Sequence, residues 1–148
     1  MNVLCIDDDP ITLMLCKKVI EKVNFASTIF TSNNGEEALE FFNSLNQDKE
    51  FEKIDIVFLD LNMPIMNGWE FLDEYIKNQF DKVFHKTKFI VLSSTIDPKD
   101  INKSKTYEIV IDFISKPITK ELLEDLKTKL NSYETHKTRN RSADFSTS

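Results

Sequence analysis

The chain has 148 residues, of which 41% are hydrophobic and 30% are charged, and its formal net charge is −6. This length suits one domain with a substantial core, and the acidic balance argues against a nucleic-acid partner, which needs a basic face. The chain has only two glycines, which excludes the glycine-rich phosphate loops of dinucleotide-binding and P-loop proteins.

The sequence also carries no sign of a membrane partner. No apolar run approaches the ~20 residues of a membrane span, and the aspartates at positions 7–9 interrupt the apolar start that a signal peptide needs. Cys5 and Cys16 lie in apolar surroundings without the spacing of metal ligands, so we expect both to be reduced and buried. These features predict a cytoplasmic protein.

The first half of the chain alternates short apolar runs with segments of helical periodicity. The apolar runs at residues 3–6, 27–30 and 54–59 predict three strands. A helix is predicted from the Asp9-Pro10 pair to about residue 22, and a second begins at a cap on Asn34 and carries apolar residues through position 45.

The second half continues the alternation. Residues 69–78 predict a helix and residues 88–92 a strand, and a short helix is expected behind the Asp97-Pro98 pair. Residues 110–114 predict the fifth strand, and Thr119 caps a last helix that presents leucines at helical spacing.

Five strands alternating with five helices indicate a doubly wound α/β fold. The crossovers are long enough for right-handed connections, so we expect a parallel sheet with helices on both faces. The domain is predicted over residues 1–133, and the polar composition of residues 134–148 predicts a disordered tail.

Polar side chains follow the ends of four of the predicted strands. Asp7 and Asp8 follow the first strand, Asp60 ends the third, Ser93 follows the fourth and Lys116 the fifth. Taken singly, each has a simpler interpretation: the aspartates as an acidic turn, Ser93 as a hydrogen-bonding group at a strand end, and Lys116 as a surface lysine. Because the carboxyl ends of parallel strands share one edge of the sheet, their joint placement predicts a site with Asp60 at its centre.

Three clustered carboxylates repel one another. Two like charges ~4 Å apart cost about 1 kcal/mol in water and about 4 kcal/mol at an effective dielectric constant of 20, so such a cluster takes up protons or binds a cation. Hard oxygen ligands suit Mg²⁺ or Mn²⁺. Asp60 could then attack phosphorus to give an aspartyl phosphate, with Lys116 and Ser93 supporting the phosphoryl oxygens.

These motifs, in this order and spacing, resemble the receiver domain of two-component response regulators. They are Ile6-Asp7-Asp8, residues 60–64 (Asp-Leu-Asn-Met-Pro) with Gly68 eight past the aspartate, a hydroxyl after the fourth strand, and Lys116-Pro117. The resemblance covers about residues 2–133. It implies a flavodoxin-like (βα)5 fold with strand order 2-1-3-4-5. The chain ends soon after the fifth predicted helix, which favours a stand-alone, single-domain form.

The resemblance also implies roles for the acidic residues. Asp60 is the expected phosphoacceptor. Asp8 is the expected direct ligand of Mg²⁺, while Asp7 acts through a metal-bound water. Asn62 is expected to supply its backbone carbonyl to the metal.

Further roles are implied on the opposite side of the site. Lys116 is expected to pair with the phosphoryl group, and its peptide bond to Pro117 is expected to be cis. Ser93 matches the Thr/Ser switch position, with Ser94 as a rival if the following loop differs. Phe113 matches the aromatic switch position, and without a hydroxyl only its packing can report the state.

The partners implied are a sensor histidine kinase or phosphotransfer protein upstream and an unidentified protein downstream. The downstream contact is expected at the face of the fourth helix, fifth strand and fifth helix, in a monomer or a phosphorylation-dependent dimer. The expected role is regulatory rather than enzymatic, and an intermediate place in a phosphorelay stays open.

Two other classes remain as alternatives. A Mg²⁺-dependent phosphohydrolase wants a second acid two residues after the nucleophile, where this chain has Asn62. A flavin-binding domain needs a phosphate-cradling loop after the first strand, where this chain has aspartates.

Overall fold

The computed structural model describes residues 1–48 and 53–131, so the predicted polar tail at residues 134–148 lies outside the described residues. In chain order the elements are β1 (Asn2–Ile6), α1 (Pro10–Lys22), β2 (Thr28–Ser32), α2 (Gly35–Gln47), β3 (Ile56–Asp60), α3 (Gly68–Lys77), α4 (Phe80–Val83), β4 (Lys88–Ser93), α5 (Pro98–Ser104) and β5 (Val110–Ser115). A last helix covers residues 120–131.

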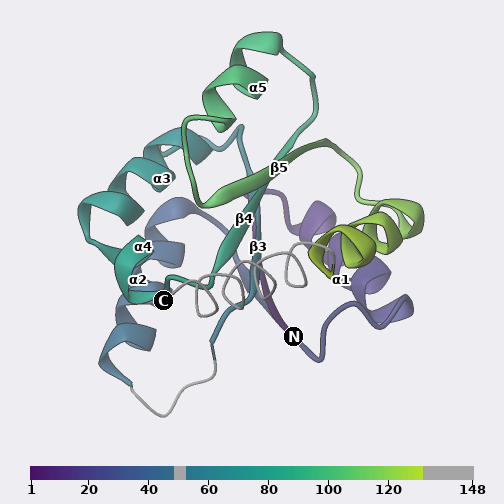
Figure 1. Ribbon diagram of the computed structural model, residues 1–148, viewed down its shortest axis with the longest axis horizontal. Coiled ribbons are helices and arrows are strands. Elements are labelled where there is room, and N and C mark those ends of the chain that lie inside the picture. Colours follow the sequence, from purple (N-terminus) through teal and green to yellow (C-terminus); the bar gives the residue numbers. More distant parts are fainter. Residues whose placement is uncertain (49–52, 132–148) are drawn as a thin grey trace, which may run out of the picture.

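The five strands form one parallel sheet in the order β2-β1-β3-β4-β5; β3, β4 and β5 are labelled in Figure 1. This confirms the predicted fold class and strand order. Every residue of β1, which Asp7 follows, and of β3, which ends at Asp60, is buried. Asp60 lies opposite Leu92 in the ladder, so the ends of β3 and β4 lie at the same edge.

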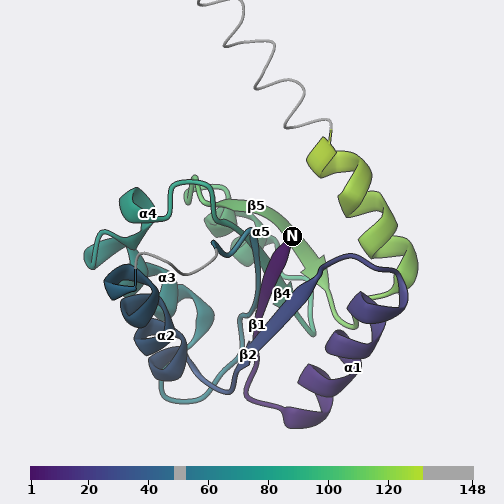
Figure 2. The same cartoon turned by 90° about the horizontal axis from the view of Figure 1, so that it is seen from below.

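Helices cover both faces of the sheet. α1 and the helix at residues 120–131 lie on one side, and α2 and α3 lie on the other (Figure 2). Because successive side chains of a strand point to opposite faces, Leu4 and Val57 join the core under α2 and α3. Their neighbours Cys5 and Phe58 join the core under α1.

The described part of the chain has six helices, one more than the sequence predicted. The additional helix, α4, is a single turn between α3 and β4. Phe80 at its start is buried, with its ring 5.6 Å from that of Tyr75 and 6.2 Å from that of Phe42. Tertiary packing of aromatic rings forms this turn, and one turn is too short to leave a periodic pattern in the sequence.

No helix among the described residues is both long enough and apolar enough to cross a membrane.

Candidate functional site

One lysine joins the ends of two strands at the carboxyl edge of the sheet. Lys116 follows β5, and its Nζ lies 2.7 Å from Oδ2 of Asp7, just past β1, and 3.0 Å from Oδ1 of Asp60, the last residue of β3. Asp7 is 4% exposed and Asp60 is 1% exposed. The structure therefore brings together three of the residues that the sequence placed in one site.

The three consecutive aspartates after β1 have different surroundings. The carboxylate of Asp7 turns inward and accepts a hydrogen bond from the backbone N–H of Asp9 (2.9 Å). Asp9 caps α1 by accepting from the N–H of Ile11 (3.0 Å), which satisfies a donor that the first helical turn leaves free. Asp8 between them is exposed at the mouth of the site. Helix capping thus orients the loop that carries Asp7.

The loop after β3 folds back onto Asp60. Oδ1 of Asp60 accepts a hydrogen bond from the N–H of Asn62 (3.1 Å), and the N–H of Gly68 donates to the carbonyl of Leu61 (2.9 Å). A Cβ on Gly68 would lie 2.9 Å from the backbone oxygen of Asp60, so this close approach needs a glycine. Asn67 then begins α3 in a reciprocal capping box with Glu70.

The site opposes ionisation of the central carboxyl. Burial raises the pKa of Asp60 to about 6; the nearby charge of Asp7 acts in the same direction, and the hydrogen bond from Lys116 acts against it. Partial burial lowers the pKa of Lys116, but its contacts with Asp7 and Asp60 outweigh this effect, so the net pKa is raised. The lysine therefore stays charged between two buried acids.

The donor set fits a hard divalent cation. Asp7, Asp8 and Asp60 each offer a carboxylate oxygen, and these oxygens lie within 4.8 Å of one another. The side chains of Asp7 and Asp60 are buried. The single positive charge of Lys116 does not balance the negative charges of these two residues and of Asp8. Oxygen-only clusters of this kind suit Mg²⁺ or Mn²⁺.

The remaining predicted residues surround this core of charges. Ser93 is buried at the end of β4, where its hydroxyl accepts from the N–H of Thr95 (3.3 Å) and its carbonyl accepts from the N–H of Lys116 (2.8 Å). Phe113 is half-buried on β5 opposite Val91. The peptide bond between Lys116 and Pro117 is cis. The side chain of Asn62 is exposed.

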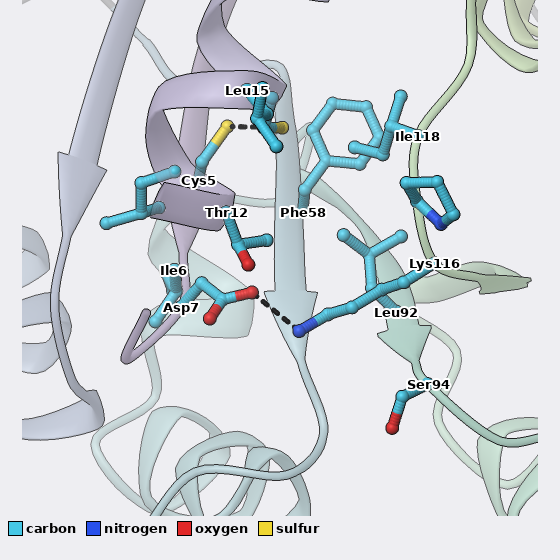
Figure 3. A pocket seen from close by; sticks show the side chains of 13 residues that line it. Cys5, Ile6, Asp7, Thr12, Leu15, Phe58, Leu92, Ser94, Lys116 and Ile118 are labelled. Carbon is cyan, nitrogen blue, oxygen red and sulfur yellow. Dashed lines mark hydrogen bonds and ion pairs between the residues drawn. The ribbon is translucent and has the colours of Figure 1, made fainter. Parts of the chain in front are cut away.

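Two cavities of about 240 Å³ each flank the carboxylates. One opens beside Asp8, between the loops after β1, β2 and β3, and includes Asn34 and Pro64 in its wall. The other is lined by Asp7 and Lys116, the two members of the ion pair, and by Cys5 and Phe58 (Figure 3). A small ligand can therefore approach the charged groups from either side.

The sequence did not predict a set of side-chain contacts that connects α3 with α5 and the loop after it. The indole Nε1–H of Trp69 donates to Oδ1 of Asp100 (3.2 Å), and the indole stacks on Tyr107 with ring centroids 5.6 Å apart. The hydroxyl of Tyr107 donates in turn to Asp73 (2.7 Å). These partners lie more than 30 residues apart, and hydrophobic periodicity carries no signal for such a pairing.

The family described as "Response regulator receiver domain" matches residues 3–127 of the chain. "Two-component response regulator ARR12" of Arabidopsis thaliana is 31% identical over 126 residues, which are 85% of this chain and 19% of the relative. "Probable C4-dicarboxylate response regulator DctR" of Halalkalibacterium halodurans is 29% identical over 90% of this chain and 51% of the relative. The chain thus spans between about a fifth and about half of these relatives' lengths.

Solved structures agree with the sequence comparison. A two-component response regulator from Cytophaga hutchinsonii matches with a TM-score of 0.79 and 32% identity, over 88% of this chain and 96% of that structure. A response regulator receiver protein from Dyadobacter fermentans matches with a TM-score of 0.74 and 25% identity, over 87% and 96%. Chemotaxis protein CheY4 of Vibrio cholerae, at 20% identity over 86% and 96% and a TM-score of 0.66, shares the fold.

Proposed function

The chain belongs to the response regulator receiver domain family of two-component signalling, and from this premise we propose that it is a regulatory phosphoacceptor. In this proposal Asp60 takes a phosphoryl group from a phosphohistidine on a sensor histidine kinase or phosphotransfer protein. The phosphorylated chain then binds a downstream protein, so the role is regulatory rather than enzymatic.

The observation that carries the proposal is the position of Lys116 between two buried carboxylates. Its ammonium lies 3.0 Å from Asp60 and 2.7 Å from Asp7, at the edge of the sheet where parallel α/β folds bind ligands. A positive charge held beside the nucleophile is placed to stabilise the negative oxygens of a transferring phosphoryl group.

The transfer itself needs few protein groups. A carboxylate oxygen of Asp60 forms a bond to phosphorus while the bond from phosphorus to the histidine nitrogen of the donor breaks, and the nitrogen keeps the electron pair. The second acid, Asp7, holds Lys116 in place. Ser93 follows Leu92, the residue opposite Asp60 in the sheet. Its hydroxyl, which now accepts from the N–H of Thr95, would rotate to donate to a phosphoryl oxygen.

We assign Mg²⁺, or Mn²⁺, to the acidic cluster. Asp8 and Asp60 would hold the ion directly, Asp7 would hold it through a water, and Asn62 would add its backbone carbonyl. When bound, the ion supplies positive charge that neutralises the phosphoryl oxygens. The support for this assignment is the oxygen-only donor set, whose members lie within 4.8 Å of one another.

The output surface that we propose comprises α5, β5 and the helix at residues 120–131. Ser93 lies at the end of β4, and Phe113 is half-buried on the neighbouring strand β5. Movement of Ser93 toward the phosphoryl group would let Phe113 pack further inward and would shift an existing equilibrium at this surface.

The test is phosphorylation without a kinase. Incubation with Mg²⁺ and acetyl phosphate, followed by intact mass measurement, is expected to show the gain of one phosphoryl group. The gain should be lost in Asp60→Asn and kept in Asp125→Asn, an equal charge change at an exposed site. Equal phosphorylation of Asp60→Asn would overturn the proposal, and so would multiple turnover of a small phosphate ester without a phosphorylated protein, because that is the behaviour of a hydrolase.

A further inference from the structure

Two thiols that play no part in the proposed function meet inside the protein. Cys5 lies on β1 and Cys16 on α1, and their Sγ atoms are 3.4 Å apart. Both are free cysteines, with exposed fractions of 2% and 7%. The pattern of the sequence predicts that each is buried, but not that strand and helix bring them into contact.

The thiols are nevertheless not sealed off. Both line the cavity of about 240 Å³ that is also lined by Asp7 and Lys116, and Cys5 is labelled in its wall in Figure 3. Its walls near the sulfurs are apolar and include Phe58. A water molecule takes up about 30 Å³ in the liquid, so a void of this size admits a molecule of several heavy atoms.

We propose that Cys5 and Cys16 form a modification site for a small hydroperoxide, which converts the two thiols into an intramolecular disulfide. The proposal rests on two independent features, which are the contact of the two sulfurs and the cavity that reaches them. A small uncharged oxidant suits this void, because its walls near the sulfurs are apolar.

The reaction balances in two steps. One thiol sulfur takes the terminal oxygen of the hydroperoxide as the oxygen–oxygen bond breaks, its proton passes to the leaving oxygen, and a sulfenic acid and an alcohol result. The second thiol sulfur then attacks the first, the sulfur–oxygen bond breaks, and the leaving hydroxide takes the proton of the second thiol and departs as water. The two thiols together lose two electrons and two protons, and the hydroperoxide is reduced.

The expected product joins α1 to β1. A disulfide has a sulfur–sulfur distance of ~2.0 Å, so the two sulfur atoms must approach each other by roughly 1.4 Å from their present separation. The bond would form at the inner end of the cavity, two residues before Asp7. It would fix the packing of α1 against the strand that carries this acid.

The experiment treats the folded wild-type chain with tert-butyl hydroperoxide and measures masses without reduction. Cys5 and Cys16 fall in one tryptic peptide, residues 1–17, because the first lysine of the chain is at position 17. We expect this peptide to lose the mass of two hydrogens, and the loss to reverse with a dithiol reductant. Each of Cys5→Ser and Cys16→Ser should instead yield a sulfenic acid that dimedone traps on the remaining cysteine.

Three outcomes would overturn the inference. The first is a peptide that gains only oxygen at its methionines while both thiols stay free. The second is disulfide formation only between chains. The third is oxidation that occurs in urea and not in the folded protein, which would mean that the cavity gives no access. The wild-type measurement decides between these outcomes even if a serine variant folds poorly.

Discussion

Asp60 combines two opposing requirements in one side chain. A nucleophile toward phosphorus must be ionised, yet this carboxyl is 1% exposed and has a second acid, Asp7, beside it. Lys116 offsets only part of this cost, because burial and Asp7 still raise the pKa of Asp60 to about 6. The residue that the proposed function needs most is therefore one that reduces the stability of the metal-free fold.

The pH dependence of stability follows from this pKa. The pKa of Asp60 is 3.8 ordinarily and about 6 in the folded chain. Between these two pH values the folded state therefore keeps a proton that the unfolded state has lost. The contribution of this group to the free energy of unfolding therefore falls as the pH rises through this window. Asp60→Asn should remove the fall and raise the free energy of unfolding at pH 7 by about 1–3 kcal/mol.

Urea titrations in the presence of a chelator, repeated across this pH range, measure the effect. Asp125→Asn, at an exposed position, is the control and should follow the wild-type curve. A variant at Asp60 that is less stable than the wild type at pH 7 would contradict the argument.

Among the elements, the loop from β3 to α3 depends most on one small residue. Gly68 lies where the chain turns back over the end of β3, and its backbone N–H donates to the carbonyl of Leu61. The neighbours of an added Cβ would be backbone atoms of Asp60 and Leu61 at 2.9 and 3.0 Å. These backbone atoms, at the end of β3 and just after it, cannot move aside as a side chain can, so the loop itself would have to shift.

Gly68→Ala is therefore expected to lower the free energy of unfolding by about 1–3 kcal/mol and to slow phosphorylation by acetyl phosphate. Gly35→Ala is the matched control, since it also adds one methyl at the start of a helix. There the nearest atom is the sulfur of Met66 at 2.6 Å, and a methionine side chain can rotate away. Urea unfolding and rates of mass gain compare the two, and equal losses would argue against the backbone contact as the cause.

At the scale of the whole molecule, the sheet separates two cores that differ in character. The core under α2 and α3 is aromatic, and Phe42 lies at its centre. The centroid of its ring lies within 6.5 Å of the centroids of six other aromatic rings, which belong to Phe41, Phe71, Tyr75, Phe80, Phe84 and Phe89. The core under α1 contains the two cysteines and borders the cavity. One core is thus packed mainly by aromatic rings, while the other contains the pair of thiols.

Phe42→Ala is expected to lower the free energy of unfolding by about 3–5 kcal/mol, because it leaves a cavity in the densest part of the fold. Phe30→Ala, at a half-buried ring on the edge strand β2, is the control and should cost less. Urea unfolding followed by circular dichroism measures both. A loss at Phe42 no larger than that at Phe30 would show that the aromatic core is not the main source of stability.

The sequence predicted the features that depend on period and topology. The alternating apolar runs predicted the sheet, and because strand ends share one edge of a parallel sheet, the sequence also placed Asp7, Asp60 and Lys116 in one site. The sequence could not predict α4, which is one turn long, or the contact between Cys5 and Cys16. Periodicity says which side chain faces inward, but which two inward side chains touch depends on how a helix is rotated over the sheet.

Trp69 is the only tryptophan of the chain; its ring stacks on that of Tyr107, and the ammonium of Lys103 lies 5.4 Å from its centroid. Its emission therefore depends on whether α5 stays packed against α3 or moves away and lets water reach the indole. The protein thus carries a built-in optical reporter for one of the elements that we propose for its output surface, and fluorescence can follow that element in solution without an added dye.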